Sequence, residues 1–550
     1  MNLAHDPELN FYYYGEEPPH PGMFRKYLTD PKLVAVDVET ISLKERIAIG
    51  VGVAVSPTMA FYFTLFPSPS SVTPWHLLKD PSVTKLFHNA PFDLLCLREY
   101  EISNENSIDT NILGNLLNIR PTRLIDLSSH VYMKYGIWYE VEPAKDFLEK
   151  HNAKVMLDAP QEAVAVKCCQ DAMATFGVYN FLLPDTDEEY FNTENQLIPI
   201  LVDMSCKGIP IDQEARAEFE IKLAAEVDYY SSLTREEGFS ISSPQQVGYM
   251  LAKRGAYNVF KRIPFTRGGK TGKKQLRTDE EILNKMDDPL AAMILAYRNK
   301  AKLLSTYIRP WANEDRAYTR FHLDAVTGRI SSTDRNMQNI PKGSAREIFV
   351  PENGCFTDVD FSQIELRVLA NVSGDIEMQY IFDTDGDIHQ ETADFLGIPR
   401  RISKNVNFAM IYGATDNTIA ETAHIRDINK ARELKQMWFD KWRGAGDWIQ
   451  TQQEEALRHP YIKTMFGREI RLPTEEEESI DRIMRKAINY PIQGSAAEIM
   501  KRALIRCKHL PMCLQVHDEI LFDGKVELPQ LNDIAELDTP VEIKYLQRWE

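Results

Sequence analysis

The sequence lacks several features that would place it in a simple class. Its 550 residues contain no run near the about 20 consecutive apolar residues that a membrane-spanning helix needs. The start, Met1 to Asn10, has neither the basic segment nor the apolar stretch of a secretory signal peptide. Glycine and proline are too few for a fibrous or disordered chain, and no internal repeat or low-complexity segment is present. We therefore expect several globular domains, no membrane span and a cytoplasmic location.

Cysteine is also scarce and poorly arranged for structural roles. The seven cysteines are scattered, and none forms the paired CxxC units of a zinc site. Cys168 and Cys169 are adjacent, which suits neither a disulfide nor a shared metal. This odd, scattered set fits a reducing compartment in which most cysteines are small core residues.

Basic residues are outnumbered by acidic ones, so the total charge does not favour a nucleic-acid partner. The formal net charge is −18. DNA binding depends on a local basic surface rather than on the total charge, however. One basic track has no intervening acid; it consists of Lys253, Arg254, Lys261, Arg262, Arg267, Lys270, Lys273, Lys274 and Arg277. The track fits contacts with phosphates and, judged alone, fits a solvated loop equally well.

Hydrophobic patterns predict two α/β regions with a helical region between them. Three strand-like runs and a helix pattern between residues 33 and 100 indicate an α/β domain that ends near Leu183. The polar segment 184–189 has the composition of a linker. Mostly helical patterns follow over 191–311, and strands and helices alternate from residue 319 onward.

Two segments of the C-terminal half place aspartates where elements end. Residues 355–361 read as a strand with Asp360 near its end, followed by a helix, and the main-chain carbonyl of Phe361 is a further oxygen ligand. Residues 512–522 predict a hairpin with Asp518 at its turn. Such aspartates commonly have only structural roles. Together, two of them can hold a pair of divalent ions about 4 Å apart that promotes phosphoryl transfer.

A third segment, 399–413, predicts a helix with a proline at its start and a glycine at its end. Four of its residues recur at four-residue spacing and therefore lie along one stripe, namely Arg400, Lys404, Phe408 and Tyr412. Two cations followed by two aromatic rings suit a triphosphate followed by a sugar and a base. An amphipathic helix with a solvated basic end explains the same pattern about as well.

A fourth segment carries a polar stripe of the same spacing, made of Arg485, Asn489 and Gln493. Such side chains can contact acceptors in the minor groove of a duplex. Exposed polar stripes usually face solvent, so this segment only supports the others.

Together these segments resemble the sequence motifs of family A DNA polymerases, which are typified by bacterial DNA polymerase I. Residues 360–367, 400–413 and 515–519 resemble motifs A, B and C of that family. Further resemblances lie upstream in the family's order, at 208–212, 243–246, 305–307, 327–332 and 336–341. The resemblance implies a hand-shaped domain that extends a primer on a template by two-metal phosphoryl transfer.

The resemblance also implies roles for individual residues. Metal ligands in this domain would be Asp360, Phe361 (through its carbonyl) and Asp518, with Glu519 and Lys404 as further catalytic residues. The incoming deoxynucleotide would contact Gln363, Glu365, His389, Arg400, Lys404, Phe408 and Tyr412, and Glu365 and Tyr412 would exclude a 2′-hydroxyl. The primer–template would contact Arg329, Gln338, Asn339, Arg485, Asn489, Gln493, Gln515 and His517, and the basic loop at Lys270, Lys273 and Lys274.

Four acids in the N-terminal region resemble those of 3′–5′ exonucleases with an RNase H-like fold. They are Asp37, Glu39, Asp93 and Asp171. In that family such acids hold two metal ions that activate a water against the terminal phosphodiester. Their position ahead of a polymerase implies proofreading.

Lys167 departs from the exonuclease pattern. That family usually has a tyrosine or histidine shortly before the last acid, and Lys167 stands at the tyrosine position, four residues before Asp171. The missing hydroxyl would orient the attacking water, so we expect a weakened but active exonuclease. A purely structural domain that keeps its acids is the alternative.

The resemblance assigns domains, partners and cofactors. The expected order is an exonuclease-like domain at 1–184, a thumb at 185–320, the first part of the palm at 321–384, fingers at 385–480 and the rest of the palm at 481–550. Primer–template DNA and deoxynucleoside triphosphates are the expected partners, with two Mg²⁺ ions in each of the two sites and Mn²⁺ as a substitute. Whether a processivity factor, a helicase or a single-strand binding protein is also a partner is left open.

The length and the intact acids weigh against other readings. The short segment before Asp37 leaves no room for a separate 5′ nuclease domain, which fits a compact bacterial or phage form acting in replication, with repair as the alternative. Glu365 and the exonuclease-like domain weigh against a single-subunit RNA polymerase. A DNA-binding scaffold with decayed sites, or a stand-alone exonuclease, would not keep Asp360, Asp518 and the cations of the third segment in order.

Overall fold

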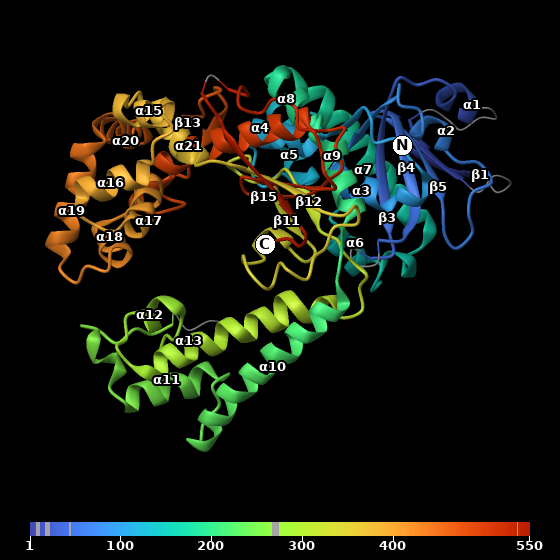
Figure 1. Cartoon of the computed structure of the whole chain (residues 1–550). Helices are drawn as coiled ribbons and strands as arrows, with labels where there is room; N and C mark the ends of the chain where they lie inside the picture. The colour runs from blue at the N-terminus through green and yellow to red at the C-terminus, as the bar shows by residue number, and fades with distance from the viewer. Residues whose placement is uncertain (7–10, 17–22, 43–45, 267–273, 536) are drawn as a thin grey trace.

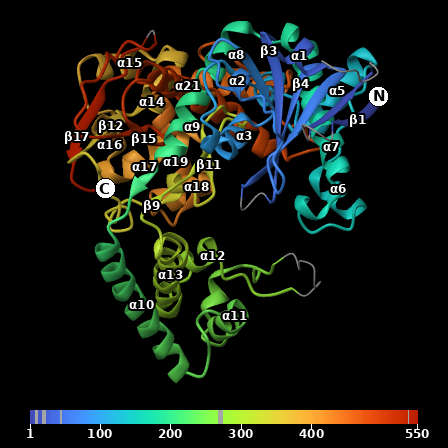
Figure 2. The same cartoon turned by 90° about the vertical axis from the view of Figure 1, so that its right-hand side faces the viewer.

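The structure is a computed structural model that describes residues 1–6, 11–16, 23–42, 46–266, 274–535 and 537–550. A β-sheet domain lies at one end and a helical region, α15–α20, at the other, with a smaller sheet between them (Figure 1). A helical unit, α10–α13, projects away from this central part (Figures 1 and 2). In the described part of the chain, no helix has the length and apolar content to cross a membrane.

The N-terminal domain is built on a seven-stranded sheet in the order β1-β2-β5-β4-β3-β6-β7. Its strands are β1 (Asn2–Asp6), β2 (Phe11–Gly15), β3 (Leu33–Thr40), β4 (Ala48–Ser56), β5 (Met59–Thr64), β6 (Thr84–Phe87) and β7 (Ser107–Asp109). The central strand β3 pairs antiparallel with β4 and parallel with β6. The long, largely buried helix α7 (Gln161–Leu182) packs on β3, β4 and β5. The expected α/β domain is confirmed, and β3 brings its acids beneath α7.

Shorter helices complete this domain. They are α1 (Met23–Leu28), α2 (Trp75–Leu78), α3 (Ala90–Cys96), α4 (Thr110–Leu116), α5 (Leu124–Tyr135) and α6 (Ala144–Lys150). The helix expected over 92–100 begins earlier, at Ala90, and ends at Cys96, after which a short 3₁₀ turn follows.

The segment predicted as a linker at 184–189 connects α7 to the next helix through a 3₁₀ turn, and only its last two residues are α-helical. Asp187 caps α8 (Glu188–Asn195) by accepting a hydrogen bond from Tyr190 N at 3.1 Å, and α9 (Leu197–Lys207) follows. An acidic run is favourable in the first turn of a helix, and this explains a composition that resembles a linker. Because α9 contacts α3, α21 and β15, the first part of the expected thumb lies between the N-terminal sheet and the central sheet.

The projecting unit consists of α10 (Gln213–Glu236), α11 (Pro244–Lys253), α12 (Glu280–Asn284) and α13 (Pro289–Lys302). It has its own small core, which includes Val247, Leu251 and Ile294. Helices α10 and α13 pack against each other and connect this core to the rest of the molecule.

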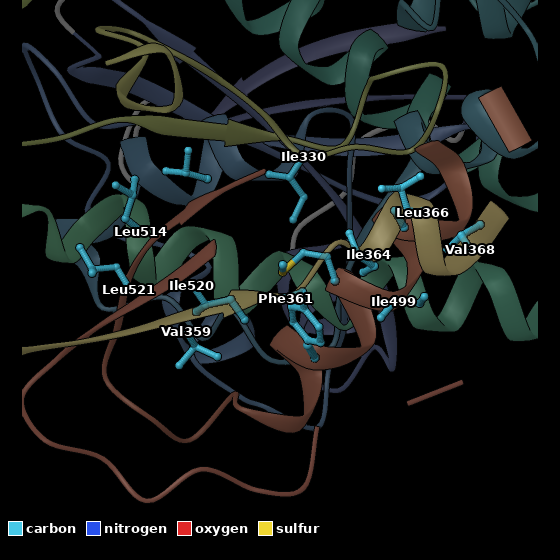
Figure 3. Close-up of a cluster of buried hydrophobic side chains, with 14 of the residues drawn as sticks. Ile330, Val359, Phe361, Ile364, Leu366, Val368, Ile499, Leu514, Ile520 and Leu521 are labelled. Carbon is cyan, nitrogen blue, oxygen red and sulfur yellow. The ribbon is translucent and has the colours of Figure 1, made fainter. Parts of the chain in front are cut away.

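The central sheet has the order β15-β16-β12-β17. Its strands are β12 (Phe356–Phe361), β15 (Met512–Val516), β16 (Glu519–Asp523) and β17 (Val541–Leu546). Figure 3 shows the apolar side chains of this region, among them Val359, Phe361 and Ile520, together with Leu366 and Ile499 from α14 (Ile364–Ser373) and α21 (Ile480–Arg506). Both the strand and the hairpin that we predicted around the two aspartates are therefore present, and both are set in this core.

The fingers region is helical. Its helices are α15 (Ile376–Asp383), α16 (Ile388–Leu396), α17 (Arg400–Ile411), α18 (Asp416–Thr422), α19 (Ile428–Lys441) and α20 (Arg443–Ala456). Two short hairpins complete the described elements, β10 (Arg320–His322) with β11 (Ser331–Thr333) and β13 (Tyr461–Lys463) with β14 (Glu469–Arg471). One two-residue pair, β8 (Ile209–Pro210) with β9 (Arg316–Ala317), lies at the base of the projecting unit.

Candidate polymerase and exonuclease sites

The sheet register brings Asp360 and Asp518 together. Asp360 on β12 lies opposite Glu519 on β16, and Phe361 N donates to Asp518 O at 3.0 Å. Burial and the nearby Asp518 raise the pKa of Asp360 to about 6, and burial also raises the pKa of Asp518. Within the described residues neither carboxylate accepts a hydrogen bond from another side chain. Two crowded carboxylates without donors fit a divalent cation as their partner.

Glu519 is placed differently from the expectation. Its Oε1 accepts from Trp549 Nε1 at 2.8 Å and its Oε2 from Arg346 Nη1 at 3.2 Å, and its residue is buried. The Arg346 guanidinium also lies 4.1 Å from the centre of the Trp549 ring. Both oxygens of Glu519 are thus engaged, which favours a structural role over metal ligation. Neither Arg346 nor Trp549 is predictable as a partner of Glu519 from sequence patterns, because each is remote from Glu519 along the chain.

A pocket of about 230 Å³ is lined by Asp518. Tyr412 Oη donates to Glu365 Oε2 at 2.9 Å, and the Arg329 guanidinium pairs with the other oxygen of Glu365. Glu365 is buried, so this polar wall is held in one position. The remaining lining residues are Gln363, Ile364, Phe408, Ala496, Met500 and His517. The pocket therefore unites residues of the first, second and third segments.

The expected stripe on α17 is present. Arg400 and Lys404 are exposed, whereas Val406, Met410 and Ile411 are buried on the other face. Arg400 Nε pairs with Asp387 Oδ2 at 2.6 Å, and Lys404 makes no ion pair within the described residues. The stripe leads from these cations through Phe408 to Tyr412 in the pocket wall.

His389 is buried rather than presented to a ligand. It is 2% exposed, its ring stands 5.9 Å from that of Phe408, and Asn407 Nδ2 lies 3.0 Å from its Nδ1. Burial lowers the pKa of His389 to about 4, so the ring is neutral. Its Nε2 is buried without a hydrogen-bond partner in the described chain. His389 therefore supports Phe408 in this state of the protein.

Of the expected duplex-contacting residues, Arg329 and His517 line the same pocket. Gln338 Nε2 donates to Gln515 Oε1 at 3.0 Å, and Gln515 Nε2 donates to His517 O at 2.7 Å. His517 and Asn339 are exposed. The stripe Arg485, Asn489 and Gln493 lies on α21, and Gly413 at the end of α17 abuts Arg485. Lys274 is exposed on the projecting unit, and Lys270 and Lys273 lie outside the described residues.

The four N-terminal acids also converge. Asp37 and Glu39 lie on β3, Asp93 on α3 and Asp171 on α7. Burial and the neighbouring acids raise the pKa of Asp37 and of Asp93 well above the usual range. Asp37 Oδ2 and Asp171 Oδ1 are buried without a partner among the described residues. This cluster of acids requires positive charge.

Lys167 supplies part of that charge. Its Nζ donates to Glu39 Oε1 at 2.8 Å and to Asp171 Oδ2 at 2.6 Å. Asp37, Glu39 and Cys168 still offer ligand atoms within 4.8 Å of one another. Two of the four acids are thus already bridged by an ammonium group. The residues do not fit the expected two-metal centre as they stand.

Comparisons with known proteins agree with this geometry. The family described as DNA polymerase family A matches residues 211–537, and that described as 3'-5' exonuclease matches residues 23–187. DNA polymerase I of Chloroflexus aurantiacus is 32% identical over 89% of this chain and 57% of that protein. DNA polymerase I of Rhizobium leguminosarum is 29% identical over 81% of this chain and 47% of that protein. The chain thus spans about half the length of these curated relatives.

A solved structure supports the fold over nearly the whole chain. The POL domain of Pol1 from M. smegmatis, in complex with a DNA primer-template and a dNTP, aligns with a TM-score of 0.78 at 24% identity. The alignment covers 96% of this chain and 98% of that one. The family match spans more than half of the residues and includes every part of the pocket. The chain belongs to DNA polymerase family A and carries a 3'-5' exonuclease domain ahead of its polymerase domain.

Proposed function

We propose that this chain is a DNA-dependent DNA polymerase that extends a primer 3′ end with deoxynucleoside triphosphates. The observation that carries the proposal is the placement of Asp360 and Asp518 beside the Glu365–Tyr412 pocket, at the foot of the α17 stripe. The two aspartates would bind the metal ions at the reacting phosphate. The pocket would hold the sugar, and the cations of α17 would contact the remaining phosphates. Primer–template DNA and deoxynucleotides are the partners that this order fits.

The residues divide the work of phosphoryl transfer. Asp360 and Asp518, with the carbonyl of Phe361, would hold two divalent ions, expected to be Mg²⁺ with Mn²⁺ as a substitute. These ions supply charge neutralisation for the attacking 3′ oxygen and the leaving pyrophosphate.

The other residues position the nucleotide. Lys404 and Arg400 neutralise its phosphates, which for Arg400 requires exchange of its Asp387 partner. The hydrogen-bonded Glu365 and Tyr412 close the space in which a 2′-hydroxyl would sit.

A second activity, 3′–5′ exonucleolytic proofreading, is supported by the convergence of four acids in the N-terminal domain, of which Glu39, Asp93 and Asp171 are buried and Asp37 is half-buried. The acids come from the central strand β3 and from helices α3 and α7. Acids that converge from separate elements in the interior favour a cation site over a chance surface cluster. We propose that the domain removes nucleotides from the primer 3′ end, and that Lys167 limits the rate of this reaction.

The test is a primer-extension assay with an end-labelled primer on a DNA template and magnesium. Separate lanes contain deoxynucleotides, ribonucleotides or no nucleotide, and Asp518→Asn serves as the matched control of similar size. Extension with deoxynucleotides alone, lost in Asp518→Asn, is the expected result. Extension that persists in Asp518→Asn, or is absent from the wild type, would refute the polymerase proposal. Primer shortening in the lane without nucleotides reports the exonuclease independently.

A further inference from the structure

Lys167 occupies the interior of the exonuclease centre. It lies on α7 one helical turn before Asp171, and its residue is 7% exposed. Its ammonium group bridges the carboxylates of Glu39 and Asp171 at 2.8 and 2.6 Å. These acids come from different elements, so the ammonium group joins the sheet to the helix above it.

The charge balance explains why a lysine is tolerated there. Glu39 and Asp171 each accept a hydrogen bond from the Lys167 Nζ, and an ammonium group held between carboxylates is favoured in its charged form. It therefore provides one fixed positive charge among four acids. A permanently charged lysine cannot accept a proton from water, so it does not serve as a general base.

We propose that the ammonium group of Lys167 takes the place of one of the two divalent ions of the exonuclease centre, so that this chain carries a self-occupied, low-activity proofreading site. The ammonium spans the two acids that would otherwise share an ion. Asp37 is left available to hold the remaining ion, because its Oδ2 still lacks a partner among the described residues. The inference rests on the proposed exonuclease function. A low excision rate would make net primer extension predominate over excision.

The experiment removes the charge but keeps the bulk, with Lys167→Met. All variants also carry Asp360→Asn and Asp518→Asn, so that ions of the polymerase site do not contribute. The matched control is Lys85→Met in the same domain. Lys85 is also buried, but its Nζ donates to the main-chain oxygens of Asp80 and Val83, both at 3.0 Å, and not to the acids.

Two quantities are measured. The first is the number of Mn²⁺ ions bound per chain, from titration followed by electron paramagnetic resonance. The second is the rate at which a single-stranded, end-labelled oligonucleotide is shortened in magnesium. Lys167→Met is expected to bind one more Mn²⁺ than its parent and to shorten the oligonucleotide faster, on the order of a hundredfold, which is the scale of one electrostatic stabiliser. Lys85→Met is expected to change neither.

The outcomes separate the inference from the exonuclease proposal. An extra ion without faster shortening supports the inference and refutes the exonuclease function. Fast shortening by the parent that falls in Lys167→Met overturns the inference and leaves the exonuclease function standing. A folded Lys167→Met that gains neither ion nor rate also overturns the inference. Should Lys167→Met fail to fold, Lys167→Tyr, which restores the residue expected from the resemblance, undergoes the same two measurements.

Discussion

Replacement of Arg346 by methionine tests the role that the structure gives to Glu519. The Arg346 and Glu519 residues are 3% and 5% exposed, and their Nη1 and Oε2 atoms lie 3.2 Å apart. Arg346 also donates to the main-chain oxygens of Ile340 and Glu550, both at 3.1 Å. Its removal leaves the Glu519 carboxylate buried, with Trp549 Nε1 as its remaining donor among the described residues. An uncompensated buried charge is strongly destabilising.

The magnitude follows from this geometry. Breaking a buried ion pair by removing one partner costs about 3–5 kcal/mol. At about 2 °C per kcal/mol for a domain of this size, the melting temperature of the polymerase domain falls by about 6–10 °C. The double variant Arg346→Met/Glu519→Met leaves no buried charge. Both variants take the Arg346 donor from Ile340 O and Glu550 O, and the double variant in addition orphans the Trp549 indole N–H. That orphaned donor costs about 1–3 kcal/mol, so the double variant is more stable than the single one.

The assay is urea unfolding followed by tryptophan fluorescence. Trp311, Trp438, Trp442 and Trp549 are fully buried in the polymerase domain, so the signal reports mainly on that domain. A loss below about 1 kcal/mol in Arg346→Met, or losses that add in the double variant, would refute the reasoning. As a parallel check, Glu519→Gln extends primers with the same Mg²⁺ requirement as the wild type. A tenfold higher requirement, or about 1.4 kcal/mol, would contradict a purely structural role and show that Glu519 contributes to metal binding.

Three further predictions concern the pocket and α17. Glu365→Ala frees the space beside Tyr412, and ribonucleotide incorporation relative to deoxynucleotide rises on the order of a hundredfold; unchanged discrimination in a competition assay would contradict this. Lys404→Ala removes one phosphate contact and raises the KM for deoxynucleotides about tenfold or more, because hydrogen bonds to charged groups contribute about 1.5–3 kcal/mol. The same substitution at Arg401, a nearby exposed residue, is the control and has little effect on the KM. Gly413→Ala lowers kcat, because φ is +68° and the added Cβ meets Arg485 Cγ at 2.9 Å; wild-type extension rates would show that Arg485 moves freely.

The elements that the sequence predicted well are those whose signals are local. The strand of Asp360 and the hairpin of Asp518 each follow from an apolar run broken by polar residues, and a four-residue spacing is enough to place Lys404 and Tyr412 on one stripe. The pocket then required only that these segments share one core. Side-chain orientation was harder, since burial of His389 depends on how α16 packs on α17.

The misses have physical reasons. Glu519 and Arg346 are separated by 173 positions, so no pattern in a single sequence connects them. The acidic segment at 184–189 has the same composition as a linker, and only the helix that follows shows that Asp187 is a cap. The ion pair of Lys167 with Asp171 was also missed, although a lysine and an aspartate four residues apart on one helix commonly pair. The bridge to Glu39 depends on the packing of α7 on β3.

The position of β12 determines when the polymerase site can exist during synthesis. Both of its neighbours in the sheet, β16 and β17, come from the last part of the chain, after the whole of the fingers region. Until residues 519–523 of β16 have been made, β12 has two open edges and Asp360 has no partner strand, and one edge stays open until residue 546 completes β17. All seven strands of the N-terminal sheet are complete by residue 109, and its covering helix α7 by residue 182. The exonuclease domain can therefore fold early on the ribosome, while the catalytic sheet of the polymerase must wait for the last strand and depends meanwhile on protection of an unpaired β12.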